Sequence, residues 1–186
     1  MTDRDRELVS NLRCEFNIAR VQRAEELNHR KLSAAIGALN NTTNPDLGPF
    51  LTPPTTFRHR QDIEDFAQKT IDRWVAEKYY GHKDRSGATV ATRLNLAGFP
   101  TLYAQENIAF DHPSAQWVFD SFMQSSVHRA NILNPGNVYV GIGTLLHDPD
   151  GTETWLNTKD TPNHDMTISV PVRLWCAVFY TPRPTA

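Results

Sequence analysis

Residues 80–133 read YGHKDRSGATVATRLNLAGFPTLYAQENIAFDHPSAQWVFDSFMQSSVHRANIL. Within this stretch, His82, Glu106 and His128 stand among small and polar residues, and they belong to three different predicted elements. Side chains so far apart in the sequence can meet only in a tertiary cleft. Imidazole and carboxylate groups are the usual components of a divalent-metal site or of an acid–base pair. The stretch therefore predicts a cleft formed by these three residues.

Each candidate residue also has a plainer interpretation. In the plainer interpretation, His82 does no more than place a favourable charge beyond a helix C-terminus. Glu106 and Asn107 can form an ordinary turn in which Asn107 bonds its own backbone. The pair His164 and Asp165, in the polar insertion TKDTPNHDMT, is more typical of an exposed surface than of a site.

Four motifs follow one another along the chain: GHKD with GATVATRLNLAGF, then QENIAF, SSVHRANIL and VYVGIG. Together they make the region from about Asp65 to Tyr180 resemble the CAP superfamily of cysteine-rich secretory, antigen-five and pathogenesis-related (SCP-like) proteins, in its bacterial style. The resemblance implies an α-β-α sandwich that is used outside cells to hold lipids, sterols, peptides or partner proteins.

The resemblance also implies which residues line the cleft, namely His82, Glu106 and His128. Ser125 stands where eukaryotic members carry a second acid, so the cleft set becomes His82, Glu106, Ser125 and His128. The missing carboxylate disfavours acid–base chemistry that needs two acids. We expect His82 and His128 to bind Zn²⁺ weakly, because two imidazoles give fewer strong ligands than a closed structural site.

Length and charge narrow the class of protein. A chain of 186 residues suits one domain that buries roughly 70% of the surface exposed by the unfolded chain. With 19 basic and 21 acidic residues and no Lys/Arg run, a nucleic-acid partner is disfavoured. No stretch approaches the roughly 20 apolar residues of a membrane span.

The expected location follows from the resemblance, which implies an extracellular protein or one on the surface of an extracellular particle. The opening residues, MTDRDRELVS, are charged where a signal peptide would be apolar, so we expect no signal peptide in this chain. The two cysteines, Cys14 and Cys176, lie near opposite ends. They are interpreted either as a disulfide pair that closes a long loop or as two buried thiols.

The pattern divides the chain into three parts: a helix over residues 1–39, an irregular arm over 40–60, and a core over 61–186 on which the helix packs as part of one domain. The arm is rich in Asn, Thr and Pro, which disfavour regular elements. The apolar stripe of the first helix fails at Arg23. We therefore expect the turns beyond Arg23, and the arm, to make intermolecular contacts.

Three further helices are predicted in the core. The clearest ends near Gly81, a natural C-cap, and its apolar stripe contains Ile63, Phe66, Ala67, Thr70, Ile71, Trp74 and Val75. A short helix is expected over residues 90–96, with Arg93 bracing the next loop by bonding carbonyls. Ser114 is a good N-cap for a helix through Met123, whose apolar face contains Trp117, Val118 and Phe122.

Strands are predicted near the end of the chain. VYVGIGTLL and ETWLN are joined by a hairpin turn, HDPDGTE, and a third strand covers residues 172–180. The two glycines of VYVGIG indicate the close approach of another backbone. The expected fold is of the α+β class, a small antiparallel sheet covered by helices, which agrees with the α-β-α sandwich that the resemblance implies.

Three functions remain open. The first is an extracellular binding module whose cleft holds a divalent metal, a small apolar ligand or a protein partner. The second is a structural component of a larger assembly or homo-oligomer. The third is a weak zinc-dependent hydrolase in which His82 and His128 hold the metal and Glu106 activates water.

Overall fold

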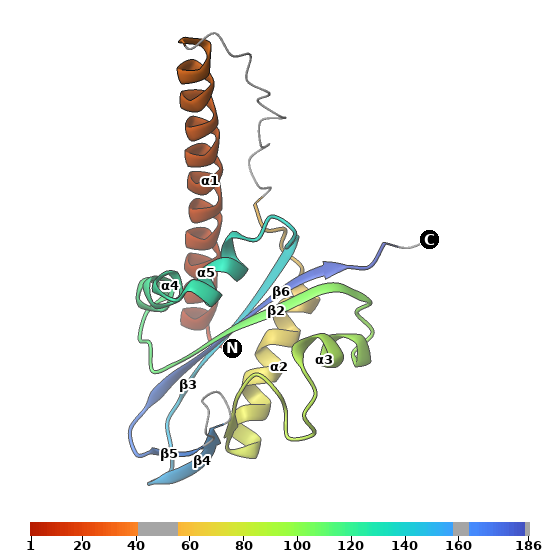
Figure 1. The fold of residues 1–186 in the computed structure, drawn as a ribbon. Helices are drawn as coiled ribbons and strands as arrows, with labels where there is room; N and C mark the ends of the chain where they lie inside the picture. Colours follow the sequence, from red (N-terminus) through yellow and green to blue (C-terminus); the bar gives the residue numbers. More distant parts are fainter. Residues whose placement is uncertain (41–55, 158–163, 185–186) are drawn as a thin grey trace.

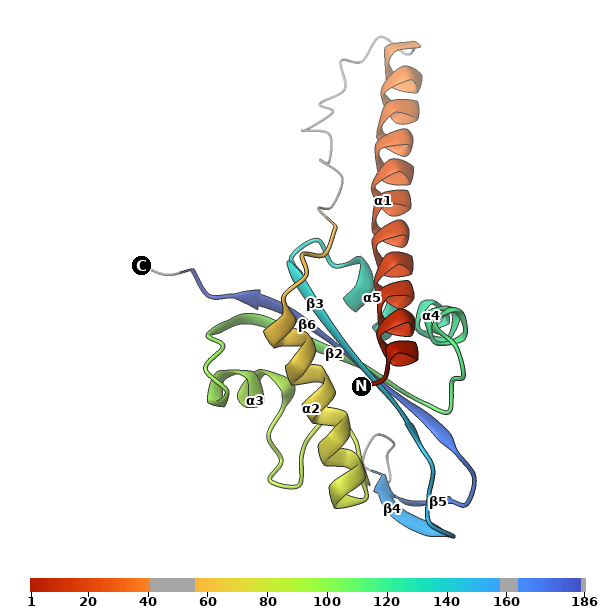
Figure 2. The ribbon, with the colours of Figure 1, turned by 180° about the vertical axis from the view of Figure 1, so that it is seen from behind.

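The computed structural model describes residues 1–40, 56–157 and 164–184, and it has three layers (Figure 1). The central antiparallel sheet has the strand order β2-β6-β3, with β2 at Thr101–Phe110, β6 at Val172–Pro182 and β3 at Tyr139–His147. One face is covered by α2 (Gln61–Glu77) and α3 (Val90–Leu96). The other is covered by α1 (Asp3–Asn40), α4 (Ala115–Gln124) and α5 (Ser126–Leu133), as both views show (Figures 1 and 2). The predicted α-β-α sandwich is confirmed.

The middle strand, β6, explains why both faces need a helical layer. Its side chains alternate between the two hydrophobic clusters, as a strand requires. Leu174, Cys176, Val178 and Tyr180 face α2 and α3, whereas Trp175, Ala177 and Phe179 face α1 and α4. A strand that is apolar on both faces has to be buried on both.

Helix α2 lies unusually close to β3, as the two glycines predicted. A Cβ atom on Gly141 would lie 2.3 Å from the backbone oxygen of Ile63, and one on Gly143 would lie 2.8 Å from the backbone of Ala67. These positions accept only glycine because the helix backbone occupies the space of a side chain. The contact fixes α2, and with it the loop that carries His82.

The end of α2 differs from the prediction. The helix ends at Glu77 and is capped by Lys78 in the left-handed conformation (φ 47°), not by Gly81. Tyr79 and Tyr80 are buried and form a two-residue strand, β1 (Tyr79–Tyr80), beside β4 (Glu153–Asn157). Pairing with a distant strand has therefore ended the helix early.

A second small sheet, absent from the prediction, has the order β1-β4-β5. Strand β1 runs parallel to β4, and β5 (His164–Ile168) runs antiparallel to it. The segment HDPDGTE is thus no hairpin turn, since β3 and β4 belong to different sheets. Residues 164–167 of the predicted polar insertion are part of β5, and Asp165 is exposed, whereas residues 158–163 lie outside the described part.

Two further elements correct details of the prediction. QENIAF is not a turn but the inner part of strand β2, which pairs with β6 from Thr101 to Phe110. Ser114 caps α4 as predicted, accepting from the Trp117 amide at 3.3 Å, and Val118 and Phe122 are buried. Trp117 itself is 63% exposed, so it does not belong to the buried face.

Helix α1 packs on the sheet through its first half and extends beyond the layers with its second half (Figures 1 and 2). Near its start, Asp5 accepts a hydrogen bond at 2.7 Å from Arg173 of β6, and both side chains are buried. The buried arginine of the helix is Arg20, which lies over the Phe57 ring at 4.0 Å, and burial lowers its pKa to about 10. Residues 41–55 of the predicted arm lie outside the described residues.

The cysteines are both free. Cys14 is exposed on α1, and Cys176 is buried in β6, so the interpretation as a buried thiol holds for Cys176 alone. No helix in the described part of the chain is long and apolar enough to cross a bilayer.

Candidate functional site

The structure brings His82 and Glu106 together. His82 lies in the loop after β1, and its Nδ1 atom is 3.1 Å from Oε2 of Glu106 on β2. The Glu106 side chain is only 2% exposed, whereas that of His82 is 42% exposed. A carboxylate beside Nδ1 favours the tautomer with its proton on that nitrogen, which leaves Nε2 as an acceptor. The more exposed His82 is therefore the group that a ligand can reach.

Arg93 holds the other oxygen of Glu106. Its Nη2 group donates to Oε1 at 2.7 Å, and its Nη1 group donates to the Thr70 hydroxyl at 3.0 Å. Nη2 also lies 3.4 Å from the backbone oxygen of His82. One buried guanidinium thus joins α2, α3, β2 and the His82 loop. The sequence predicted that Arg93 bonds carbonyls, and this is true only of the longest of these contacts, the one to the backbone oxygen of His82.

Cys176 completes the surroundings of the carboxylate from the neighbouring strand. Its Sγ atom lies 3.6 Å from Oε1 of Glu106. Burial, and secondly the Glu106 carboxylate, raise the pKa of Cys176 well above its usual value. Cys176 is therefore a protonated thiol at neutral pH, which makes it a poor nucleophile.

His128 is connected to the same strand through the next residue, Asn107. Successive side chains of a strand point to opposite faces, so Asn107 points away from the Glu106 side. Its Nδ2 group donates to the backbone oxygen of His128 at 3.0 Å, and its Oδ1 atom accepts from Asn131 at 2.8 Å. The His128 ring packs against Phe122 with the ring centroids 5.1 Å apart.

Ser125 has a structural contact in this region. It is the N-cap of α5, and its hydroxyl accepts from the His128 amide at 3.4 Å. The side chain that stands in the place of a second acid therefore orients the helix that carries His128.

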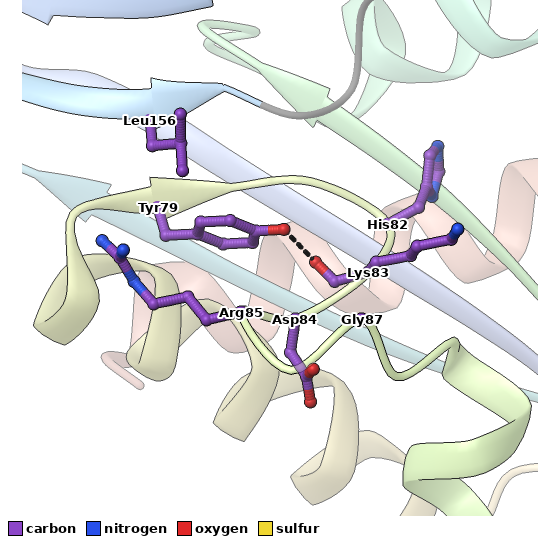
Figure 3. A pocket seen from close by; sticks show the side chains of 7 residues that line it. All are labelled: Tyr79, His82, Lys83, Asp84, Arg85, Gly87 and Leu156. Atoms are coloured by element: carbon purple, nitrogen blue, oxygen red, sulfur yellow. Dashed lines mark hydrogen bonds between the residues drawn. The ribbon is translucent and has the colours of Figure 1, made fainter. Parts of the chain in front are cut away.

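A pocket opens beside His82 (Figure 3). It has a volume of about 480 Å³ and is lined by Tyr79, His82, Lys83, Asp84, Arg85, Gly87 and Leu156. The Tyr79 hydroxyl donates to the Lys83 carbonyl at 2.5 Å, and the guanidinium of Arg85 lies 5.4 Å from the Tyr79 ring centroid. We call this the His82 pocket. Tyr79 and Leu156 give it apolar walls, and the basic side chains stand in the loop beside them.

The loop that forms the pocket is held by Asp84. Its Oδ1 atom accepts from the amides of Ser86 and Ala88, each at 2.9 Å, and from the Ser86 hydroxyl at 2.6 Å. Burial alone would raise the pKa of Asp84, but these hydrogen bonds and the charge of Arg73 lower it below its usual value. An ionised Asp84 therefore stabilises the loop conformation at neutral pH.

In the part of the chain that the structure describes, the ligands of a catalytic zinc site are not grouped together. Such a site needs three protein ligands and an open position. Among residues 1–40, 56–157 and 164–184, no three His, Cys, Asp or Glu side chains form a group that could hold a metal ion. That His82, through Nε2, and His128 together bind a divalent ion stays a prediction.

Comparison with known proteins agrees with the fold. The sequence profile of the cysteine-rich secretory protein (CAP) family matches residues 22–158. Among curated proteins, none matches the chain significantly.

Three bacterial structures are similar. A cysteine-rich secretory protein from Staphylococcus aureus aligns with a TM-score of 0.51 and 13% identity, over 97% of this chain and 40% of its own. An extracellular protein containing an SCP domain from Bacillus anthracis aligns with a TM-score of 0.47 and 17% identity, over 88% of this chain and 41% of its own. An outer surface protein from Borrelia burgdorferi aligns with a TM-score of 0.46 and 14% identity, over 68% of this chain and 80% of its own. The chain thus spans about two fifths of the first two proteins.

Proposed function

Because this chain belongs to the cysteine-rich secretory protein (CAP) family, we propose that it is an extracellular binding module that holds a small ligand at the His82 pocket. The observation that carries this proposal is that His82 lies on a pocket wall while Glu106 and Arg93 hold it from behind. A polar group fixed in this way provides orientation, and the apolar walls provide most of the contact area. The secretory description of the family supports the extracellular location.

The state of Glu106 favours binding over hydrolysis. A general base must reach the water that it deprotonates. Both oxygens of Glu106 contact protein groups, and its side chain is 2% exposed. We therefore assign Glu106 a positioning role toward His82. The small number of possible metal ligands among the described residues also supports binding over hydrolysis.

The pocket chemistry suits a ligand with an apolar body and one polar end. The body would pack against Tyr79 and Leu156, which are neighbours on strands β1 and β4, and the polar end would meet His82 or Lys83. A suitable neutral probe is benzyl alcohol, followed by amide chemical shifts in ¹H–¹⁵N NMR spectra. We expect saturable shifts in residues 79–87 and at Leu156.

Two matched leucine variants test the location. Leu156→Ser should weaken the binding of benzyl alcohol, whereas Leu146→Ser, at a 51% exposed position on β3, should leave it unchanged. No saturable shift in the wild type, or equal affinities in both variants, would show that the pocket is not the binding site.

A second candidate function is a structural component of an assembly, and it rests on the projection of α1. The second half of α1 extends past the layers of the domain (Figure 2). A helix gains most of its stability from packing of one of its faces against another element. Light scattering over a wide range of protein concentration tests this candidate. A constant monomer mass would remove it, and a concentration-dependent multimer would support it.

A further inference from the structure

A second hollow lies between α1 and the helices α4 and α5. Its volume is about 560 Å³. Helices α4 and α5 contribute three apolar side chains to its lining, those of Phe119, Met123 and Leu133. Helix α1 contributes one face, which contains Ala19, Gln22, Arg23 and Glu26. We call this hollow the α1–α4 groove, and it shares no lining residue with the His82 pocket.

The groove lies where α1 leaves the apolar core. Among the described residues, Val9, Leu12 and Phe16 of α1 belong to the buried cluster on this side of the sheet, and none after Phe16 does. The helix continues to Asn40, and its second half extends past the layers (Figures 1 and 2). Residues 32–39 read LSAAIGAL and carry no charge. Since helices depend on a packed face for their stability, an uncharged end indicates a partner surface.

Helical periodicity continues the groove-lining face of α1 toward this end. Residues three or four positions apart lie on one face of a helix, so Arg30, Ser33 and Gly37 follow Glu26 on that face. Glu26 and Arg30 are equally far from residue 28, and so are Ala19 and Gly37. Two antiparallel copies of α1, related by a two-fold axis at the level of residue 28, would therefore place the groove-lining half of each helix opposite the second half of the other.

The charges on this face are complementary in the antiparallel arrangement. Glu26 of each copy would lie opposite Arg30 of the other, so the same ion pair forms twice. Both residues are exposed, and Arg30 has no ion-pair partner among the described residues. Glu26 pairs with Arg23 at 3.0 Å, but these side chains are 59% and 42% exposed, so that pair contributes little and leaves the carboxylate open to a second cation.

The groove also suits the end of an incoming α1 helix. In the antiparallel arrangement, residues 33–37 of a second copy lie level with residues 19–23, beside the apolar side chains of α4 and α5. Arg129 lines the same groove, where its Nη1 group donates to the Met123 carbonyl at 2.7 Å. The last turn of α1 has no basic residue of its own. A cation near a helix C-terminus is favourable, so Arg129 complements the end of the second copy's helix.

We propose that the α1–α4 groove receives the second half of α1 from another copy of this chain, which gives a dimer with antiparallel α1 helices. The proposal rests on the assembly function, the second candidate above, and gives it a surface and a partner. Each copy offers one groove and one helix end, so the contact is isologous and closes at two copies.

The test is the dissociation constant of the full chain, measured by analytical ultracentrifugation. Arg30→Glu places a second acid opposite Glu26 at both ends of the contact, and the dissociation constant should rise about tenfold or more. Arg4→Glu makes the same charge change at an exposed position of α1 outside the contact. This control variant should dimerise like the wild type.

A mixture of two variants tests the antiparallel register. Glu26→Arg should weaken self-association as Arg30→Glu does, because it places two bases opposite each other. An equimolar mixture of the two variants should restore the dimer, since both contacts of the mixed dimer again join an acid and a base. Positions 26 and 30 are exposed, so neither change removes a buried contact.

Three results overturn the proposal, and they separate it from the functions above. A wild type that stays monomeric at every concentration removes the assembly function as well. A multimer that Arg30→Glu and Arg4→Glu affect equally leaves the assembly function but excludes this face. A mixture that does not restore the dimer excludes the antiparallel register. None of these results affects the binding of benzyl alcohol at the His82 pocket.

Discussion

Arg93 donates to Glu106 at 2.7 Å, and the two side chains are only 5% and 2% exposed. A buried ion pair contributes little over a well-packed apolar pair, but the loss of one partner leaves a buried charge. This pair links α3 to the edge strand β2 at the point where His82 is bonded. The position of His82 therefore depends on a contact that lies behind the accessible surface.

Removing Arg93 alone should be strongly destabilising. We expect Arg93→Met to lower the free energy of unfolding by about 3–5 kcal/mol, because the buried Glu106 carboxylate loses its cationic partner. Urea unfolding monitored by circular dichroism measures the change. The double variant Arg93→Met with Glu106→Gln should recover part of the loss, since the remaining group is neutral. No recovery in the double variant would contradict the interpretation as an ion pair.

Trp74 should be among the most costly core residues to truncate. It is fully buried on α2, and its ring packs against Tyr80 at 5.1 Å. Trp74→Ala should cost about 3–5 kcal/mol through the cavity that it leaves. Trp117→Ala is the matched control, because Trp117 is 63% exposed and should change stability by about 0.5 kcal/mol or less. Similar melting temperatures for the two variants would refute the assignment of the core.

Gly141 should not accept a side chain. A Cβ atom there would lie 2.3 Å from the backbone oxygen of Ile63, so α2 would have to move away from β3. Gly141→Ala should cost about 3 kcal/mol. Gly136→Ala, whose Cβ would meet only the Asn134 side chain at 3.1 Å, should stay within about 1 kcal/mol of the wild type. Thermal unfolding of both variants measures these changes in stability. A Gly141→Ala variant as stable as the wild type would contradict the close packing of α2 on β3.

The attachment of α1 should be sensitive to acid. Burial alone would raise the pKa of Asp5, but hydrogen bonds from Arg173 and Thr2 lower it below its usual value. A group with a lowered pKa in the folded state contributes its full stability above its unfolded pKa of about 3.9 and loses it as the pH falls through the folded pKa. Asp5→Asn should therefore be less stable than the wild type at neutral pH, by about 3 kcal/mol.

The pH dependence of that difference is the check. Unfolding free energies of the wild type and of Asp5→Asn, measured from neutral pH downward, should converge below about pH 4. A difference that stays constant down to the lowest pH would show that Asp5 acts through packing and not through its charge.

The sequence predicted the elements whose signals are local. The stripe of α2, the Ser114 cap and the glycines beside α2 follow from spacing and backbone geometry, and the structure has each of them. Strands β1 and β2 were missed because tertiary contacts decide them. Tyr79 and Tyr80 look like the end of a helix until β4 pairs with them.

The candidate site was predicted in part for the same reason. The pattern placed His82 and Glu106 in one cleft, and they are in contact. The pattern gave Arg93 a minor role, although an arginine at a core-facing position of a short helix favours a buried acid as its partner. That signal could have indicated Glu106 as its partner. Asn107 contacts His128 because QENIAF is part of strand β2. The sequence of this motif did not predict a strand, so the contact was not predicted either.

The central claim is that Glu106 positions His82 so that its Nε2 atom is open to a ligand. Long-range ¹H–¹⁵N NMR of the His82 ring, before and after addition of Zn²⁺, tests it most directly. The account predicts that neutral His82 carries its proton on Nδ1 and that Glu106→Gln disturbs this preference. It also predicts that Zn²⁺ shifts the Nε2 resonance of the wild type. The same addition should have no effect on the spectrum of a His82→Ala, His128→Ala variant. A proton on Nε2 in the wild type, or a His82 ring unaffected by Zn²⁺, would contradict it.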